Sequence, residues 1–526
     1  MNNLPRRLEL IEGSQTQCLQ RVQCLLPAEG EVFWLTGNAI KKAHTLLGQE
    51  CDALVFDAHS GFDVNAFAAV SGTLRGGGTL FLLIPPLDAW AAFPDPDYRR
   101  FIPYPYQPED VQGRFLQRLV RLLDGKEGEC HSPLQRPSLV GANGVRPLQC
   151  KQSIAIQTIV HSISPVVLTA DRGRGKSAAL GMAASQLMAA GKKVLLTSPS
   201  RATVATVFKH AENPPPFFAP DDLLQTLPQG DVLLVDEAAA IPVPLLLKML
   251  EHYPCCVFST TLHGYEGSGR GFALRFQKEL EARVAGWQAV RLHTPIRWAE
   301  NDPLECFINR ALLLDADVEA GVCNTPLHPF YRQLNRDELA HNEPLLRQLF
   351  GLLITAHYQT RPSDLRQMLD APDISIHILE QQGVILAVAL LSREGGFDAE
   401  LTAAIHAGTR RPHGHPIPQT LTFHAKIPGA ATLICERVMR IAVHPDWQNH
   451  GLGAHLLEHL LGFATHSGAD YMGVSYAMTP PLLRFWERAG FVLARVGFRK
   501  DTASGSRSVV QVKALSAAAA LLFKGL

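Results

Sequence analysis

The sequence carries no net charge and contains no long apolar run. Among its 526 residues, 49 Lys and Arg balance 49 Asp and Glu. Global electrostatics therefore do not indicate a nucleic-acid partner, and any role in RNA binding needs local evidence. No apolar stretch approaches the roughly 20 residues needed to cross a bilayer, and none follows the first seven residues as in a secretory signal. We therefore expect a cytoplasmic protein that does not associate with membranes or with DNA.

The cysteines lack the spacing of a metal site. The chain has ten of them, including the adjacent pair Cys255 and Cys256, and no C-x-x-C pair. This pattern argues against a zinc site and against a disulfide scaffold, so we expect reduced core residues. With 46% hydrophobic and 19% charged residues, the composition is that of a globular protein.

The length predicts roughly three domains, since single cores rarely exceed 250–300 residues. We place them at residues 1–135, 147–315 and 335–515, followed by a short C-terminal segment, 516–526. In the first, strand-like runs at 32–35, 53–56 and 79–84 alternate with helical stretches, which predicts an α/β fold with a parallel sheet. We interpret Arg75–Gly78 as a turn before a strand. Residues 124–147 are predicted to be a linker, and 315–370 to be mostly helical.

The second domain opens with a strand–loop–helix segment that has the features of a phosphate-binding loop. Strand 166–169 precedes the loop Ala170–Ser177. In such loops backbone N–H groups surround phosphate oxygens, a lysine contacts the outer phosphates and a hydroxyl binds Mg²⁺. Gly175, Lys176 and Ser177 supply these groups, although an alanine stands at the usual first glycine. The expected nucleotide is ATP or GTP.

A second motif agrees with a nucleotide site. The apolar strand 232–235 ends in two carboxylates, where Asp236 is placed to hold Mg²⁺ and Glu237 to orient an attacking water. Arg270 and Arg297 are candidates for stabilising transferred phosphoryl charge, with structural ion pairs as the alternative. Further strands at 194–197 and 257–260 and a helix at 242–253 complete the expected parallel sheet of a P-loop ATPase.

The third domain contains a pattern suited to acetyl-CoA. It opens with a predicted hairpin, residues 374–391. Strand 438–443 is followed by Gln448, Gly451 and Gly453 at the start of a predicted helix, 451–465. Bare amides and the helix dipole at such a start favour a pyrophosphate, while the strand end offers backbone groups to the pantetheine chain. Strand 471–476, helix 482–489 and strand 491–496 follow.

Histidines supply candidates for acid–base chemistry. His444 stands at the strand end where the thioester is expected, and a neutral imidazole there could take the proton of an attacking amine. The alternative is that His444 only orients the turn before Pro445. The backbone N–H near Val443 is a candidate oxyanion hole.

Two basic regions are candidates for RNA contacts. One combines Arg410 and Arg411 with four histidines; an RNA-facing loop or plain solvent exposure is favoured over a zinc site. These histidines are His406, His413, His415 and His424. The other region, 484–513, has seven Lys or Arg against two acidic residues. It is either a solvated face or a phosphate-tracking surface.

The segment Leu482–Phe491 resembles the GCN5-related N-acetyltransferase superfamily, whose corresponding helix ends in an aromatic-x-x-x-Gly-Phe pattern. That resemblance implies a mixed α/β acetyltransferase fold (GNAT) for the third domain. Members of the superfamily often use a tyrosine to protonate the departing thiolate. Trp486 occupies the corresponding position here and cannot do so, which leaves that role unassigned.

Taken together, the motifs resemble the bacterial tRNA(Met) cytidine acetyltransferase family, in which a helicase-like, RecA-like ATPase is fused to a GNAT domain. The most specific segment is Gly264–Phe272, and Pro295–Trp298 also carries the resemblance. The resemblance implies N4-acetylation of the wobble cytidine in elongator tRNA(Met), with acetyl-CoA as donor and accompanying ATP or GTP hydrolysis. It further implies contacts from Gln152 and Arg297 to the nucleotide and from Arg488 to acetyl-CoA.

The expected cofactor contacts combine the residues of the motifs with those implied by the resemblance. For the nucleotide they are Gln152, Gly173, Arg174, Gly175, Lys176, Ser177, Ala178, Asp236, Arg270 and Arg297, with Ser177 and Asp236 as Mg²⁺ ligands. For acetyl-CoA they are Ile441, Ala442, Val443, Gln448, Asn449, His450, Gly451, Leu452, Gly453, Ala454 and Arg488. Two alternative functions stay open: an RNA-stimulated ATPase that senses acetyl-CoA, and a protein N-acetyltransferase.

Overall fold

The computed structural model describes residues 4–125, 149–262, 269–318, 327–356, 360–500 and 506–526. The chain forms two compact units. Unit 1 comprises Met1–Trp90, Leu119–Asp315 and Tyr358–Ser363, and unit 2 comprises Ala91–Arg118, Ala316–His357 and Asp364–Leu526. Among the described residues, no helix has both the length and the hydropathy required to cross a membrane.

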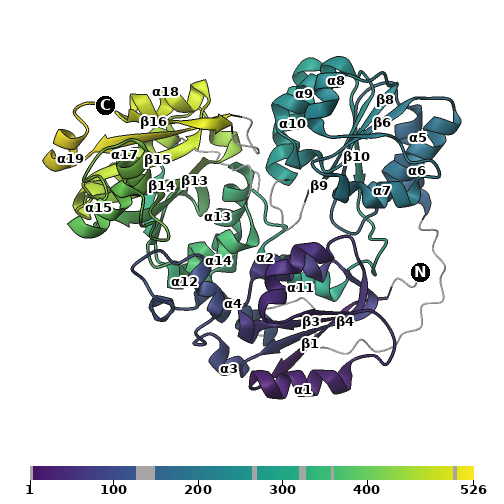
Figure 1. Ribbon diagram of the computed structural model, residues 1–526, viewed down its shortest axis with the longest axis horizontal. Coiled ribbons are helices and arrows are strands. Elements are labelled where there is room, and N and C mark those ends of the chain that lie inside the picture. Colours follow the sequence, from purple (N-terminus) through teal and green to yellow (C-terminus); the bar gives the residue numbers. More distant parts are fainter. Residues whose placement is uncertain (1–3, 126–148, 263–268, 319–326, 357–359, 501–505) are drawn as a thin grey trace. The chain divides into compact units, whose positions relative to one another are not determined.

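The N-terminal part of unit 1 contains a four-stranded parallel sheet in the order β1-β4-β3-β2, as expected from the strand–helix alternation. Its strands are β1 (Arg7–Glu12), β2 (Val32–Leu35), β3 (Cys51–Asp57) and β4 (Leu74–Ile84). Figure 1 shows α1 (Gln15–Leu25) on one side of this sheet and α2 (Val64–Ser71) and α11 (Pro303–Leu312) on the other. Strand β1 was not predicted, although its apolar residues alternate with charged ones as in a half-buried strand.

The expected turn at Arg75–Gly78 is wrong: these residues lie within β4. A Cβ atom on Gly78 would lie 2.7 Å from the Asp52 carbonyl oxygen. Glycine is used here because the β3 backbone approaches closely, not because the chain reverses.

The second sheet of unit 1 is parallel throughout, with the order β10-β5-β9-β8-β6-β7. Its strands are β5 (Val166–Ala170), β6 (Val194–Thr197), β7 (Phe217–Phe218), β8 (Val232–Val235), β9 (Cys256–Thr261) and β10 (Gln288–Leu292). Helices cover both faces (Figure 1), which explains why the central strands read as continuous apolar runs.

These helices form two layers. One layer contains α5 (Gln149–His161), α6 (Lys176–Ala189) and α7 (Ala205–His210), and the other contains α8 (Pro220–Thr226), α9 (Val243–His252) and α10 (Gly269–Arg283). The loop of the first nucleotide motif follows β5, and the two carboxylates follow β8. Parallel strands have their carboxyl ends on the same side of the sheet, so both motifs lie at that end.

Unit 2 is built on a seven-stranded mixed sheet in the order β11-β12-β13-β14-β15-β17-β16. Its strands are β11 (Phe330–Leu334), β12 (Ile374–Gln381), β13 (Val384–Gly395), β14 (Ile434–Val443), β15 (Tyr471–Ala477), β16 (Val492–Lys500) and β17 (Arg507–Ala514). The predicted hairpin is confirmed as β12 and β13. Strands β11 and β17 were not predicted, and β11 interrupts the segment expected to be mostly helical.

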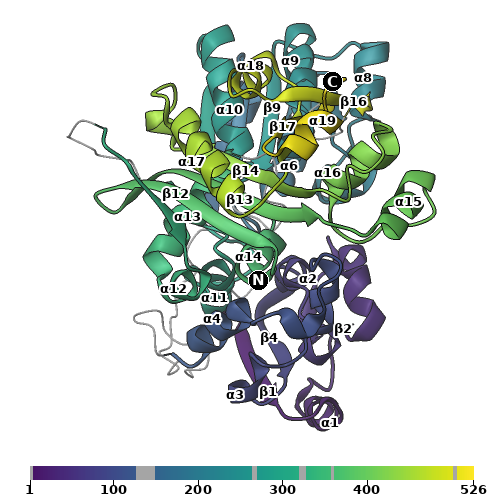
Figure 2. The same ribbon diagram turned by 90° about the vertical axis from the view of Figure 1, so that its left-hand side faces the viewer.

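In unit 2, α17 (Leu452–His466) lies beside β13 and β14 (Figure 2). The other α-helices not yet named among the described residues after Trp90 are α4 (Arg114–Leu123), α12 (Arg336–His341), α13 (Glu343–Ala356), α14 (Pro362–Asp370), α15 (Ala399–Ala407), α16 (Pro416–Gln419), α18 (Pro480–Arg488) and α19 (Ala517–Leu522). A short helix, α3 (Leu87–Trp90), ends the first segment of unit 1.

A buried ion-pair cluster ties residues 91–118 to the rest of unit 2. The fully buried Arg366 donates to Asp95 at 2.8 Å and to Asp97 at 3.1 Å, and its guanidinium lies over the Tyr98 ring. Charges this deeply buried persist only when paired. The predicted boundary between the first two domains lies in residues 126–148, outside the described residues.

Candidate functional site

The loop between β5 and α6 has the backbone conformation of a phosphate cradle. Gly173 and Gly175 both have left-handed φ angles, 77° and 78°. A Cβ atom on Gly173 would lie 2.5 Å from the Trp298 ring, and one on Gly175 would lie 2.2 Å from Gln152 Nε2. Both conformation and space therefore require glycine at these positions, which leaves the loop amides uncovered by side chains.

Two carboxylates stand opposite this loop, at the end of β8. Lys176 forms an ion pair with Glu237, which has a left-handed φ of 50°. The neighbouring Asp236 is fully buried and accepts through Oδ1 from the Ser259 hydroxyl at 2.9 Å and from the Glu237 N–H at 3.1 Å. The structure thus brings the two predicted nucleotide motifs together.

The same sheet edge holds buried polar atoms that lack hydrogen-bond partners among the described residues. They are Asp236 Oδ2, Thr197 Oγ1 and Thr260 Oγ1. Thr197, Asp236 and Thr260 lie at or near the carboxyl ends of the neighbouring strands β6, β8 and β9. Because buried polar atoms are almost always satisfied, this edge fits a bound metal ion with its water ligands. A free carboxylate oxygen beside a phosphate loop is the donor that Mg²⁺ prefers.

The predicted arginine contacts are placed differently. The nine-tenths buried Arg174 is held by Glu305 and donates to the His293 carbonyl and, within the loop, to the Arg172 carbonyl, so its side chain is already engaged by the protein. Arg297 contacts Glu50 and the Gly72 carbonyl, both in the N-terminal sheet domain. This geometry favours the structural ion pair for Arg297. The Arg270 side chain lies outside the described residues, as does most of Gly264–Phe272.

Gln152 lies at the cradle as expected from its motif. Its Nε2 is 3.4 Å from the carbonyl oxygens of Arg174 and of Gly175. The side chain therefore contacts the loop backbone.

Sequence reasoning missed the residues that support the loop from behind. Trp298 packs against Gly173 and donates to Glu305 at 3.0 Å, and the Arg6 guanidinium lies 3.6 Å from the centre of the Trp298 ring. Arg6 is also paired with the fully buried Asp302 at 2.9 Å. No motif spacing signals these contacts, because Arg6 is nearly 300 residues from its partner. Only the short run Pro295–Trp298 hinted at this region.

The second site begins where two strands of unit 2 diverge. β14 pairs with β15 only from Cys435 to Val438, opposite Tyr471–Val474, while its pairing with β13 continues to Val443. At this point the register between β13 and β14 shifts, and Met439 has no paired residue on β13. Beyond it, Ile441–Val443 has one backbone edge without a strand partner, which is the geometry needed to pair with an extended amide chain.

The start of α17 follows directly. Gly451 is its N-cap residue with a left-handed φ of 79°, and Asn449 has a φ of 65°. A Cβ atom built on Gly451 would meet no neighbouring atom within 4 Å, so open space adjoins the residue that caps this 15-residue helix. Gln448 donates to the Val443 carbonyl at 3.3 Å and joins the loop to the strand. Amides and helix dipole together fit a pyrophosphate.

Comparison with known proteins identifies the families of the domains. Family models match in chain order: tRNA(Met) cytidine acetyltransferase TmcA, N-terminal, over residues 2–130; RNA cytidine acetyltransferase NAT10/TcmA, helicase domain, over 167–214 and 213–315; and GNAT acetyltransferase 2 over 348–470 and 464–516. A tRNA(Met) cytidine acetyltransferase TmcA of Nitrosococcus halophilus is 43% identical, across 99% of this chain and 76% of its own length. The chain belongs to the TmcA family.

Other TmcA relatives show similar coverage. That of Vibrio cholerae is 36% identical across 93% of this chain and 69% of its own length, and that of Haloferax volcanii is 36% identical across 91% and 71%. Membership of the TmcA family makes the chain a cytidine acetyltransferase by descent, with a helicase-like domain and a GNAT domain.

Three residues singled out in the GNAT sequence, His444, Trp486 and Arg488, have different environments in the structure. The His444 side chain is almost fully buried, and its Nδ1 accepts from the Asp446 N–H at 3.3 Å. The Nδ1 lone pair is therefore occupied, which favours the turn-orienting role over proton abstraction. Trp486 packs in the core against Phe491 and Tyr476, while Arg488 is exposed at the end of α18.

The predicted histidine cluster separates into individual anchors. His413 and His415 bond the carbonyls of Ile102 and Tyr104, and His415 is buried, so plain solvent exposure is wrong for it. Within the described ranges, no group of three or more potential ligands forms a metal site.

Proposed function

We propose that the chain transfers the acetyl group of acetyl-CoA to N4 of the wobble cytidine in elongator tRNA(Met), with accompanying ATP or GTP hydrolysis. The observation that carries the proposal is the divergence of β14 from β15 directly before the amide-lined start of α17, in a TmcA-family chain. Membership of that family favours this function over the two alternatives, an acetyl-CoA-sensing ATPase and a protein acetyltransferase.

The transfer chemistry asks mainly for positioning. N4 attacks the thioester carbonyl carbon, the N–C bond forms and the C–S bond breaks. The nitrogen gives up one proton to a side chain or to water, and the departing coenzyme A thiolate takes up one. Cytosine N4 is a weak nucleophile because its lone pair is delocalised into the ring. Alignment against the thioester and stabilisation of the oxyanion by backbone N–H groups near Val443 therefore supply most of the acceleration.

At the nucleotide site, Ser177 and Asp236 would hold Mg²⁺ and Lys176 would contact the outer phosphates. Lys176 is paired with Glu237 in the protein alone, so phosphates would replace Glu237 as its partner. Glu237 would then be released to orient the attacking water. When bound, Mg²⁺ would neutralise charge on the phosphates.

The target cytidine must be unstacked from its loop, at a cost of a few kcal/mol. We assign nucleotide hydrolysis to this remodelling of RNA and not to activation of acetate. Under this division of labour, Lys176→Ala slows acetylation of folded tRNA but spares an unstructured oligonucleotide. Equal slowing of both substrates contradicts it.

The role of His444 is tested by conservative replacement. His444→Asn keeps an acceptor for the Asp446 N–H and removes the base. If the ring only orients the turn, acetylation continues at a near-normal kcat; a loss of about 100-fold or more identifies a general base.

One assay tests the function as a whole. The chain is incubated with labelled acetyl-CoA, ATP and either tRNA or protein, and the label is located by nucleoside and peptide analysis. Label on cytidine supports the proposal. Label on lysine, or nucleotide hydrolysis without transfer, contradicts it.

A further inference from the structure

A cavity of about 240 Å³ lies in unit 2 and is lined by residues of the segment that joins β13 to β14. Its floor is formed by the buried Ile405 of α15 and by Phe423 of the π-helix η7 (Thr420–His424). Pockets for drug-sized ligands usually enclose about 300–1,000 Å³. This cavity is thus too small for acetyl-CoA or a nucleoside triphosphate, and none of the residues assigned above to the acetyl-CoA or nucleotide contacts lines it.

Positive charge gathers around the aromatic floor. The Arg411 guanidinium lies 5.5 Å from the Phe423 ring centre, and the Lys426 ammonium lies 4.8 Å from it. Burial, followed by Arg495, Arg411 and Lys426, lowers the pKa of the His424 imidazole. None of the nine lining residues is acidic. The pocket therefore combines a flat apolar face with unopposed cations, the pairing used to bind single-stranded nucleic acid.

The pocket wall is preorganised by buried hydrogen bonds. His415 Nδ1 accepts from the Gly395 N–H at 2.9 Å, so its Nε2 carries the proton that bonds the Tyr104 carbonyl. Gln419 donates to the Pro412 carbonyl at 2.9 Å and also to that of Gly414. A wall that is already ordered loses little conformational entropy when a ligand binds.

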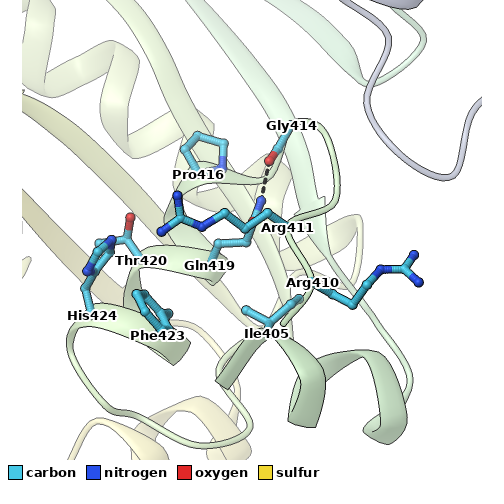
Figure 3. Close-up of a pocket in the computed structure, with 9 residues that line it drawn as sticks. All are labelled: Ile405, Arg410, Arg411, Gly414, Pro416, Gln419, Thr420, Phe423 and His424. Atoms are coloured by element: carbon cyan, nitrogen blue, oxygen red, sulfur yellow. Dashed lines mark hydrogen bonds between the residues drawn. The ribbon is translucent and has the colours of Figure 1, made fainter. Parts of the chain in front are cut away.

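Figure 3 shows how the two neighbouring arginines differ. The Arg411 side chain extends across Gln419 toward Thr420, whereas Arg410 points away from the other lining residues. The two side chains carry the same charge and are adjacent in sequence. Replacing each arginine in turn therefore distinguishes a contact inside the pocket from the effect of general surface charge.

We propose that this pocket binds one unstacked nucleotide of the substrate RNA, with the base packed on Phe423 and Ile405 and the neighbouring phosphates contacted by Arg411 and Lys426. The inference rests on the proposed function, because it takes RNA as the substrate. An acidic peptide would use the cations but has no flat face to place on the ring.

Binding of a tRNA(Met) transcript by the full chain tests the inference through two independent signals. Phe423→Ala is expected to raise Kd by about 5- to 150-fold, the value of stacking one base, without changing its salt dependence. Arg411→Ala is expected to reduce the slope of log K against log salt by about 0.7, the value for one phosphate contact on a single strand.

Matched variants separate the pocket from structural damage. Phe423→Trp keeps an aromatic face and is expected to restore binding. Phe330→Ala removes an aromatic side chain that is 65% exposed on β11 and is expected to bind RNA like the unaltered chain. Arg410→Ala removes a charge that points away from the other lining residues and is expected to change the salt slope less than Arg411→Ala does. Since Arg411 is exposed, its replacement reports on binding even if Phe423→Ala fails to fold.

The outcomes are distinguishable. Unchanged Kd and salt slope in both pocket variants, while the unaltered chain binds and acetylates the transcript, overturn the inference alone. Displacement of RNA by polyglutamate at constant ionic strength, with no effect of Phe423→Ala, identifies an acidic-peptide site and also overturns it. Failure of the unaltered chain to bind or acetylate RNA overturns the proposed function and this inference together.

Discussion

At the scale of single residues, Asp236 shows how one side chain can combine structural and chemical roles. Its Oδ1 is fixed by two donors, while Oδ2 is buried without a partner among the described residues. Ser259 on β9 thus positions the carboxylate and leaves its second oxygen for a metal ion. Second-sphere hydrogen bonds of this kind commonly orient metal ligands.

Asp236→Asn tests the metal role. The amide keeps the size of the side chain but loses the charge that Mg²⁺ needs, so we expect nucleotide hydrolysis to fall by at least about 100-fold. Asp222→Asn, on the exposed side of α8, serves as the control and should hydrolyse normally. Hydrolysis rates at saturating Mg²⁺ decide the matter; equal rates in the two variants contradict the assignment.

His377 makes unit 2 sensitive to acid. Burial lowers the pKa of this fully buried imidazole to about 4, and its two ring nitrogens bond Tyr331 and Ser375. Its folded pKa is below the unfolded value of about 6.5. The contribution of the neutral His377 ring to the free energy of unfolding is therefore complete above a pH of about 6.5. It is lost as the pH falls toward the folded pKa of about 4, and the loss amounts to about 3 kcal/mol.

Thermal unfolding measured between pH 7.5 and 4.5 checks this expectation. Replacement of His377 by glutamine, which has no titratable ring, should reduce the loss of stability over that range. A variant whose melting temperature falls with pH as steeply as that of the unaltered chain contradicts the role of His377.

At the scale of elements, α17 carries a matched pair of glycines. Gly451 at its start and Gly468 beyond its end have similar left-handed φ angles, 79° and 75°, and a Cβ on either meets nothing within 4 Å. Alanine at each position should cost a similar 1–2 kcal/mol or so of backbone strain. Only at Gly451 would that strain distort the amides facing the pyrophosphate.

We therefore expect Gly451→Ala to weaken coenzyme A binding by about 10-fold or more, and Gly468→Ala to leave it unchanged. Titration calorimetry with coenzyme A measures the difference, and melting temperatures confirm that the two variants are equally destabilised. Equal affinities would place the pyrophosphate elsewhere.

The P-loop offers a second comparison of the same kind. Gly173 and Gly191 have nearly equal φ angles, 77° and 78°, but only Gly173 faces a neighbour, the Trp298 ring. Gly173→Ala should lower the melting temperature more than Gly191→Ala and should also weaken nucleotide binding. The excess loss measures the contact with Trp298, and identical melting curves would contradict the close approach.

At the scale of the whole molecule, buried ion pairs join segments that are far apart in sequence. In unit 1, Arg6 and Asp302 connect the first strand to the start of α11, and Trp298, Glu305 and Arg174 continue the contact to the P-loop. The N-terminal sheet and the nucleotide cradle thus share one network. Arg297, through Glu50 and the Gly72 carbonyl, and Arg172, through the Ala69 carbonyl, add further contacts between the two.

Asp302→Asn should be strongly destabilising because it leaves the buried Arg6 charge without its counter-ion. Breaking such a pair typically costs about 3–5 kcal/mol, whereas Glu50→Gln removes only exposed pairs worth up to about 1 kcal/mol. Differential scanning calorimetry of the two variants compares the costs. A smaller loss in Asp302→Asn than in Glu50→Gln would contradict the burial argument.

Local patterns in the sequence were sufficient for the central strands and for both phosphate loops. Runs such as Val232–Val235 and the alternation at Ile374–Ile378 predicted β8 and the β12–β13 hairpin, because apolar periodicity follows directly from burial on one or two sheet faces. The edge strand β11 has a weaker pattern and was missed, since most of its residues are exposed or half-exposed. Strand β17, which pairs with both β15 and β16, was also missed, and the edge strand β16 extends well past its predicted end.

The sequence by itself determined that two glycine-containing loops precede helices in one chain and which strands and helices present them, because glycine spacing and hydrophobic period are local properties. Only the tertiary structure decided how the supporting side chains are used. It engages Arg174 with Glu305, buries His444 against the Asp446 N–H, and assembles Ile405, Arg411 and Phe423 into one pocket. These outcomes depend on contacts between segments separated in sequence, and no local spacing encodes which partner a charged or aromatic side chain meets.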